Sequence, residues 1–271
     1  MYAFDEHTRV ERIGEARWSG AVADVYNVGS APNGGYLMAI GARALAGDLA
    51  HPHPLTVTAH YLRRSENGPV EIRTTVVREG RTLSTGAASL FQDGREVVRL
   101  LATFTDLETA EGPSHVSASA PDLPDPEDLP SSADVPGLPA VVRAFDHRLT
   151  PASVGFALGV ETGRAEVEGY TRFPDDRPVD PFALLLVADA LPPPVLNVVE
   201  ADWVPTIEMT VHVRAIPSPG WLSFRLGTRA LVDGHLDEDG EIWDRSGRLV
   251  AMSRQIALVL PPRDGGRRGP Q

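Results

Sequence analysis

Apolar and polar residues alternate along most of this chain, in short runs that end at turn residues. Alternation with a period of two is typical of strands that turn one face toward a core. The dipeptides Asp93-Gly94 and Ser246-Gly247 predict tight turns with positive φ between such runs. We expect strands at about 12–28, 55–63, 70–78, 82–92 and 95–106, and again at about 144–171, 206–215, 221–233, 235–244 and 247–260.

Two segments depart from this alternation and are apolar on nearly every side. Residues 34–47 and 181–191 predict one long, buried helix in each half of the chain. Many antiparallel strands with a single long helix per half favour an α+β fold, in which each sheet wraps around its helix.

The two halves also match each other in sequence. Three pairs of segments follow in the same order: 33–45 with 179–191, 56–64 with 206–214, and 94–102 with 247–255. Their offsets of 146, 150 and 153 residues are nearly constant. This regularity predicts a tandem duplication of one domain.

A proline-rich segment separates the two halves. Residues 111–139 contain seven prolines and neither Lys nor Arg, a composition that favours an extended linker. We therefore expect an N-terminal domain at 1–110, a C-terminal domain at 140–263 and a flexible tail at 264–271.

Composition excludes several kinds of chemistry. The chain has no Cys and all 25 basic residues are Arg, which excludes disulfides, thiol nucleophiles and Schiff-base lysines. The formal net charge of −12 argues against nucleic acid or an anionic membrane as a partner. No apolar stretch approaches the roughly 20 residues that span a bilayer. No secretory signal is visible at the N-terminus, so we expect a cytoplasmic protein.

Asp189 is the only charged residue in the apolar run 182–191. A carboxylate on a buried helix loses hydration, which is unfavourable unless the group is hydrogen-bonded or used in chemistry. The alternative is an Asp at a helix end, which reaches solvent or caps the turn at Pro192-Pro193-Pro194.

The order of elements and three separate motifs resemble the type II acyl-CoA thioesterase (TesB-like) family. The helix supplies Asp189, the strand start Thr206-Ile-Glu-Met-Thr210 supplies Thr206, and the last strand, Val250-Ala-Met-Ser-Arg-Gln255, supplies Gln255. This resemblance implies a double hotdog, with two tandem hotdog domains that each wrap a sheet around a helix. Met209 and Thr210 depart from the His-Ser of that family, which leaves the acyl-chain preference open.

The resemblance implies that Asp189 takes a proton from water, which Thr206 and Gln255 hold in place. The helix start at Asn33, Gly34, Gly35 and Tyr36 would bind substrate, with the Gly35 N–H polarising the thioester oxygen. The alternative for this segment is a plain Gly-Gly turn.

Arg63 could meet the phosphates of coenzyme A, although exposed arginines at strand ends are common. We expect no cofactor apart from coenzyme A as part of the substrate. We also expect no metal, because His51 and His53 have no third ligand nearby. A homodimer is expected by analogy.

The duplication provides an internal comparison. In the sequence alignment Arg43 corresponds to Asp189 and Ala102 to Gln255, and only Thr206 has a like counterpart, Thr56. This asymmetry is expected if one active site survived the fusion. The rival functions are a non-catalytic acyl-CoA or lipid-binding hotdog protein, and a thioesterase for acyl-carrier-protein thioesters. A hydratase is disfavoured because neither predicted helix contains His.

Overall fold

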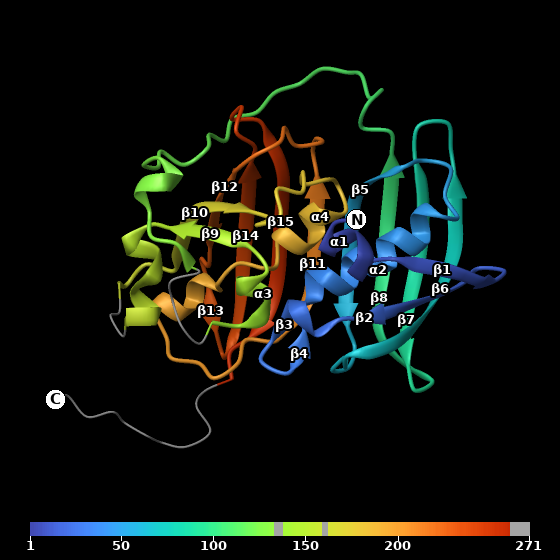
Figure 1. Cartoon of the computed structure of the whole chain (residues 1–271), viewed down its shortest axis with the longest axis horizontal. Helices are drawn as coiled ribbons and strands as arrows, with labels where there is room; N and C mark the ends of the chain where they lie inside the picture. Colours follow the sequence, from blue (N-terminus) through green and yellow to red (C-terminus); the bar gives the residue numbers. More distant parts are fainter. Residues whose placement is uncertain (133–137, 159–161, 261–271) are drawn as a thin grey trace.

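An antiparallel sheet of thirteen strands runs through both halves of the chain (Figure 1). The structure is a computed structural model that describes residues 1–132, 138–158 and 162–260. From one edge to the other the strands are β1 (Val10–Gly14), β2 (Arg17–Val22), β6 (Gly68–Glu79), β7 (Ser84–Gln92), β8 (Arg95–Thr105), β5 (His53–Tyr61), β11 (Thr206–Val213), β15 (Leu249–Leu258), β14 (His235–Trp243), β12 (Leu222–Gly227), β10 (Glu166–Arg172) and β9 (Asp146–Leu149), with β13 (Leu231–Val232) beside β14. β3 (Asn27–Val28) and β4 (Ala31–Pro32) form a separate pair.

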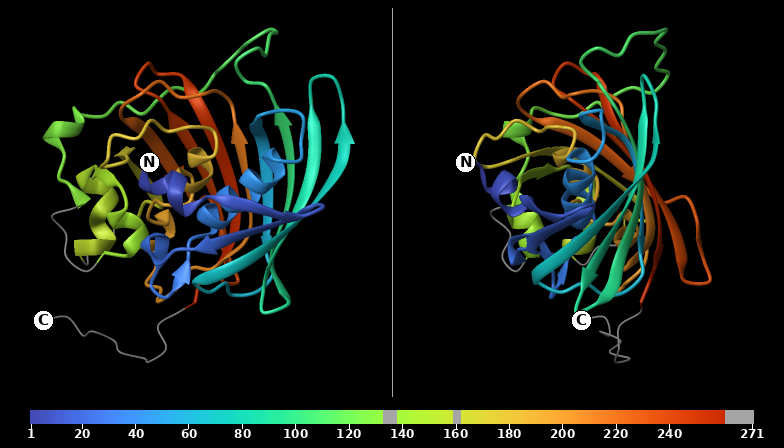
Figure 2. Two further views of the ribbon diagram at one scale, coloured as in Figure 1. Left: turned by 45° about the vertical axis from the view of Figure 1, so that its right-hand side comes forward. Right: turned by 90° about the vertical axis from the view of Figure 1, so that its right-hand side faces the viewer.

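The helices α2 (Gly34–Ala46) and α4 (Ala183–Val187) lie on the concave side of the curved sheet (Figure 2). Nearly every residue of α2 is buried, as its apolar sequence predicts. The shorter helices are α1 (Ala3–His7) and α3 (Ala140–Arg143), with 3-10 turns at Asp24–Tyr26, Pro126–Asp128, Pro151–Leu158 and Pro194–Asn197. The helices of the two halves therefore share one core inside the sheet.

The second helix is much shorter than the sequence predicts. It covers Ala183–Val187 rather than 181–191. Asp189 follows the helix in a turn, and the Asp189 N–H donates a hydrogen bond to the Leu186 carbonyl at 3.1 Å. Proline has no N–H and restricts the residue before it, so Pro192-Pro193-Pro194 cannot continue a helix. The apolar run thus predicts burial correctly but not helix length.

β5 and β11 pair side by side and join the two halves into one sheet. Each has a bulge at the matching place, between Pro54 and Thr56 in β5 and between Thr206 and Glu208 in β11. The structural counterpart of Thr206 is therefore Pro54, and the predicted counterpart Thr56 is wrong by two residues. A slip of two leaves every side chain on the same face of a strand, so the alternation could not reveal it.

The remaining sequence predictions hold with local exceptions. Asp93 and Gly94 both have positive φ (48° and 73°), as a tight hairpin turn requires, and Gly247 has a φ of 77°. The predicted strand at 221–233 is divided into β12 and β13. The region 144–171 contains β9 and β10, with the 3-10 turn Pro151–Leu158 between them.

The proline-rich segment is only partly free of the domains. Its first part has no regular secondary structure up to Pro126, whereas Leu129 is buried and its carbonyl accepts a hydrogen bond from Arg148 of β9 at 3.1 Å. The second part of the predicted linker 111–139 therefore packs against the C-terminal half. The tail predicted at 264–271 lies outside the described residues.

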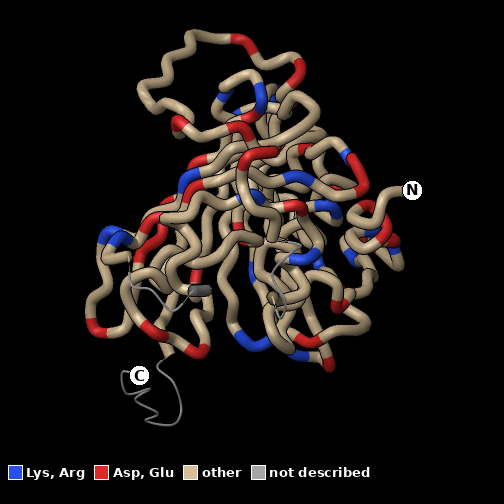
Figure 3. The backbone as a smooth tube through the Cα atoms, turned by 60° about the vertical axis from the view of Figure 1, so that its left-hand side comes forward, with Lys and Arg blue, Asp and Glu red and all other residues tan. Residues whose placement is uncertain are grey.

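Acidic and basic residues are distributed over strands and loops rather than gathered at one point (Figure 3). Of the helices in the described part of the chain, none has the length and apolar character that a membrane span requires.

Candidate active site

A cavity of about 780 Å³ opens between the start of α2, the end of α4 and the strands where the two halves meet. Most of its wall is apolar, with Leu37, Val142, Phe156, Leu196 and Trp203 among the lining residues. The polar and ionisable side chains on the wall include Ser30, Asn33, Tyr61, Arg63, Arg64, Ser65, Asp189, Asp202, Thr206, Glu238 and Gln255. All three predicted catalytic residues, Asp189, Thr206 and Gln255, thus line one cavity.

Asp189 is half-buried and is held by the start of α2 from the other half of the chain. Its Oδ2 accepts a hydrogen bond from the Gly35 N–H at 2.8 Å, and its backbone carbonyl accepts one from Asn33 Nδ2 at 2.7 Å. Loss of hydration raises the pKa of Asp189 to about 6, although hydrogen bonds from the backbone of Gly35 and Gly34 and from the Asn33 side chain lower it. A carboxylate with a pKa near 6 is ionised at neutral pH and is a useful general base.

The contact between α2 and α4 depends on glycine. A Cβ on Gly35 would lie 2.3 Å from the Leu185 carbonyl oxygen and 2.8 Å from Cβ of Asp189. A Cβ on Gly34 would lie 2.6 Å from the hydroxyl oxygen of Tyr61. Only residues without a side chain allow these backbones to approach so closely.

The helix start has a different role from the predicted one. The Gly35 N–H, which we expected to polarise the thioester oxygen, donates to Asp189 instead. Both ends of the Asn33 amide are also used, because Oδ1 caps α2 by accepting from the Tyr36 N–H at 3.0 Å. In this structure Asn33 and Gly35 therefore orient the carboxylate.

Tyr36 does not line the cavity. Its side chain is fully buried, and its hydroxyl donates to the His7 carbonyl at 2.7 Å and accepts from the Ala23 N–H at 3.0 Å. The prediction that Tyr36 binds substrate is therefore wrong, because α2 turns its third residue toward the core. Arg63 does line the cavity, with one guanidinium nitrogen 2.7 Å from the Glu96 carbonyl oxygen.

Thr206, Gln255 and Glu238 form a chain of hydrogen bonds in the wall of the same cavity. The Thr206 hydroxyl donates to Gln255 Oε1 at 2.6 Å, and Gln255 Nε2 donates to Glu238 Oε1 at 2.8 Å. Burial raises the pKa of Glu238 to about 8, with the hydrogen bond from Gln255 opposing that shift and the charge of Asp189 adding to it. The sequence analysis missed Glu238. The signal was available, because Glu238 occupies an inward position of the alternating strand.

Tyr61 is the second residue that the sequence analysis missed. Its hydroxyl oxygen is buried beside Gly34 and has no hydrogen-bond partner among the described residues. Burial, together with the charges of Asp189 and Glu208, raises its pKa well above the usual value, so the hydroxyl keeps its proton. Tyr61 ends β5, where strand alternation alone gives no sign of a polar contact.

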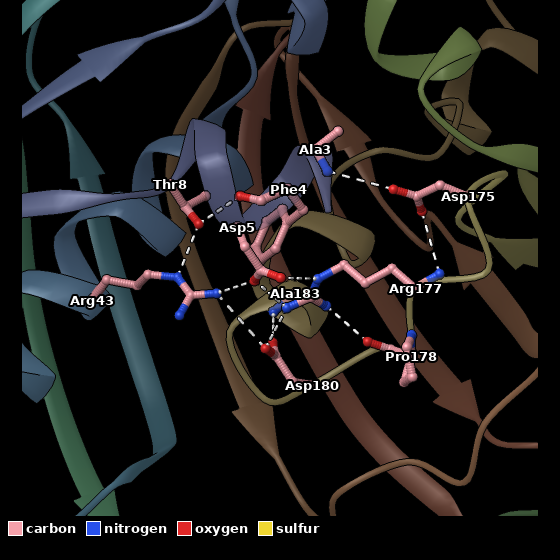
Figure 4. A network of polar contacts seen from close by, with 10 residues as sticks. All are labelled: Ala3, Phe4, Asp5, Thr8, Arg43, Asp175, Arg177, Pro178, Asp180 and Ala183. Atoms are coloured by element: carbon pink, nitrogen blue, oxygen red, sulfur yellow. Dashed lines mark hydrogen bonds and ion pairs between the residues drawn. The ribbon is translucent and has the colours of Figure 1, made fainter. Parts of the chain in front are cut away.

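The duplication creates a second position that corresponds to the Asp189 site, and there an ion-pair network fills the space (Figure 4). Asp180 caps α4 by accepting from the Ala183 N–H at 2.7 Å, as Asn33 caps α2. Counted from these matched helix starts, Ala42 rather than Arg43 is the counterpart of Asp189. Arg43 instead lies 3.7 Å from Asp180 in an ion-pair network.

The N-terminal helix α1 closes this second place. Asp5 binds both Arg43 and Arg177, at 3.0 and 2.6 Å, and Arg177 also binds Asp180 at 2.6 Å (Figure 4). Phe4 is 1% exposed and lies under the guanidinium of Arg177, 4.7 Å from the ring centroid. The part of the chain that the structure describes therefore has one site of this kind, in the cavity with Asp189.

Family models match both halves of the chain. The model of the acyl-CoA thioesterase N-terminal domain matches residues 22–105, and that of the acyl-CoA thioesterase C-terminal domain matches residues 118–259. The chain belongs to the acyl-CoA thioesterase family. The C-terminal match begins within the predicted linker, in agreement with the packing of Leu129.

Solved structures agree with this family assignment. A proposed thioesterase II of Thermobifida fusca YX is 36% identical and has a TM-score of 0.88, over 96% of this chain and 98% of that one. A hotdog-fold protein of unknown function from Alicyclobacillus acidocaldarius is 25% identical, with a TM-score of 0.85 over 97% of this chain and 99% of that one. An acyl-CoA thioesterase II, TesB2, of Mycobacterium marinum has the same fold at 20% identity, with a TM-score of 0.75 over 96% of this chain and 99% of that one. This acyl-CoA thioesterase-family member is a thioester hydrolase, and the predicted double hotdog is confirmed.

Proposed function

We propose that this thioesterase hydrolyses fatty acyl-CoA to the free acid and coenzyme A. The observation that carries the proposal is Asp189, a carboxylate with a raised pKa that the start of α2 aims into a largely apolar cavity. The hydrogen-bonded pair of Thr206 and Gln255 lines the same cavity and can bind the water molecule at a second point. A carboxylate alone would be an unremarkable buried acid, whereas a carboxylate facing hydroxyl and amide groups can hold a nucleophile.

In the proposed reaction, a water molecule lies between Asp189 and Thr206. Asp189 takes one proton as the water oxygen attacks the thioester carbon. The Thr206 oxygen accepts a hydrogen bond from the other O–H of the water, because the hydroxyl proton of Thr206 is directed to Gln255. The tetrahedral intermediate then expels the thiolate, which recovers the proton from Asp189. The positive end of the α2 dipole favours the negative charge that develops at this place.

The cavity wall offers suitable surfaces for both the acyl chain and the coenzyme A part of the substrate. The apolar wall with Val142, Phe156 and Leu196 suits an acyl chain. Arg63 and Arg64 are exposed at the wall and suit the phosphates of coenzyme A. These two arginines favour coenzyme A over a plain alkyl thioester.

A panel of thioesters tests the proposal. Thiol release is measured with acyl-CoAs of increasing chain length and with the same acyl groups on acyl-carrier protein. We expect faster turnover of the acyl-CoAs, and weaker binding (a higher KM) for them in Arg63→Ala. Preference for the carrier-protein thioesters would support the related hydrolase, and acyl-CoA binding without any thiol release would support a binding protein.

A further inference from the structure

Glu238 is a second carboxyl group in the wall of the same cavity as Asp189. It is 5% exposed, its Oε1 accepts a hydrogen bond from Gln255 at 2.8 Å, and its Oε2 has no partner among the described residues. No arginine of the described chain forms an ion pair with either carboxyl. A buried carboxylate without a counter-ion is strongly unfavourable, and two in one cavity are more so.

The surroundings of Glu238 supply little compensation for a negative charge. The other ionisable residues on the cavity wall are Tyr61, Arg63, Arg64, Asp189 and Asp202. Arg63 and Arg64 are exposed and bind the Glu96 carbonyl and the Ser30 hydroxyl, respectively. The neighbour along β14, Asp239, has its own cations in Arg229 and Arg254, and its charge also disfavours ionisation of Glu238.

Glu238 has no counterpart in the half without a site. Glu238 lies opposite Gln255 in the pairing of β14 with β15. At the matching place in the pairing of β7 with β8, Gly86 lies opposite Ala102. The C-terminal half therefore has a buried carboxyl on the strand residue paired with Gln255, whereas the N-terminal half has a glycine at the matching position.

We propose that Glu238 is a positioning residue that works as a neutral carboxylic acid, fixing the amide of Gln255 and leaving Asp189 as the only buried negative charge beside the reacting carbon. This inference rests on the proposed function. Glu238 Oε1 accepts from Gln255 Nε2, which turns Gln255 Oε1 toward Thr206, and a neutral acid keeps this arrangement when its carbonyl oxygen is the acceptor and its proton is on Oε2. The Thr206 hydroxyl proton is then committed to Gln255, and its lone pairs are left to accept from the attacking water.

Ionisation of Glu238 would add a second negative charge beside Asp189 and the developing oxyanion. In a site of low dielectric this charge opposes the transition state, so turnover should fall when Glu238 ionises. The pKa of Glu238, raised to about 8 by burial, places this loss at alkaline pH. The pKa of Asp189, raised to about 6, sets the acid limb of the profile. Below that pH the base becomes protonated and activity is lost.

The pH dependence of kcat in wild type and Glu238→Gln tests the assignment. The amide is a permanent neutral mimic of the acid and can still accept from Gln255. We expect turnover within about threefold of wild type at pH 7, an unchanged acid limb and no loss of turnover above pH 8. Glu238→Leu, which removes the acceptor, should lower kcat about tenfold with KM unchanged. Glu241→Gln, three residues along the same strand and paired with Arg225, is the matched control and should keep the wild-type profile.

Infrared spectroscopy of the unliganded protein gives a readout that needs no turnover. At pH 7 the wild type should show a protonated-carboxyl C=O band that is absent from Glu238→Gln and that disappears from the wild type as the pH rises through about 8. Absence of this band would overturn the neutral acid, as would an alkaline limb that persists in Glu238→Gln or a loss above a hundredfold at pH 7. If the band is present but no thioester is hydrolysed, the proposed function fails while the protonation state stands.

Discussion

Tyr61 and Tyr36 carry hydroxyl groups with opposite energetics, although both side chains lie near the start of α2. The Tyr61 hydroxyl is buried without a partner among the residues that the structure describes, whereas the Tyr36 hydroxyl makes hydrogen bonds with His7 and Ala23. A buried, unsatisfied polar group costs about 1–3 kcal/mol, and a satisfied one contributes about 1 kcal/mol. The two residues therefore permit a matched comparison of substitutions to Phe.

We predict that Tyr61→Phe leaves the free energy of unfolding unchanged or raises it by about 1 kcal/mol, because it removes an unsatisfied hydroxyl. Tyr36→Phe should lower it by roughly 1–2 kcal/mol, because the backbone groups of Ala23 and His7 lose their partner. Urea unfolding followed by circular dichroism measures both. A loss of stability in Tyr61→Phe equal to that in Tyr36→Phe would show that the Tyr61 hydroxyl has a partner.

The sequence identified the candidate site residues unevenly, for physical reasons. Asp189 could be found because a charge in an apolar run is conspicuous, and Thr206 and Gln255 could be found from the motifs around them. Glu238 lies between half-buried acidic residues of the same strand, and its burial depends on how β14 packs over the cavity. The contact between Gly35 and Asp189 joins residues from different halves, which no local pattern encodes.

At the scale of elements, the approach of α2 to the end of α4 is the contact that builds the site. The two helices meet through Gly35, and the carboxylate is held at the position of closest approach. The shortness of α4 matters here, because Asp189 lies in a turn after the helix rather than within it.

Gly35→Ala should therefore damage the site more than the rest of the fold. Its Cβ would meet the Leu185 carbonyl oxygen at 2.3 Å, which forces the helices apart and breaks the hydrogen bond to Asp189. We expect kcat to fall about a hundredfold, since small misplacements of a catalytic group have effects of that size, and stability to fall by about 1–3 kcal/mol. Gly14→Ala, whose Cβ would have no contact closer than 3.7 Å, is the control and should change neither quantity much. Wild-type turnover in Gly35→Ala would show that this contact does not hold the base.

At the scale of the whole molecule, the cavity with Asp189 is open, whereas the corresponding position near the end of α2 is closed by α1. The three matched segments correctly predicted the duplication, the repeated order of elements along the chain and the α2 position. They could not give the register between halves, because a two-residue slip preserves strand alternation. The length of the second helix and the packing of the linker depend on proline geometry and on tertiary contacts, which periodicity does not report. The homodimer stays a prediction.

The closed second position, where α1 meets Arg43 and Arg177, should matter for stability and not for turnover. Phe4 is 1% exposed and packs between Arg177 and Phe173, and residues 1–27 contribute nothing to the cavity wall in the described structure. We predict that Phe4→Ala lowers the free energy of unfolding by about 3–5 kcal/mol, while kcat of the folded protein stays within twofold of wild type. Leu101→Ala removes an exposed side chain (54% exposed) and should cost less than about 1 kcal/mol. A large loss of kcat in folded Phe4→Ala would contradict the division between an active site and a closed second position.

If Asp189 is the base of a single thioesterase site, its loss must abolish hydrolysis without abolishing binding. The decisive experiment compares thiol release from one acyl-CoA by wild type and Asp189→Asn, beside the affinity of both proteins for a non-hydrolysable acyl-CoA thioether. We expect the mutant to bind the thioether like the wild type but to hydrolyse the thioester at least a thousandfold more slowly, since the amide cannot accept the proton from water. Undiminished turnover in Asp189→Asn would contradict this role of Asp189.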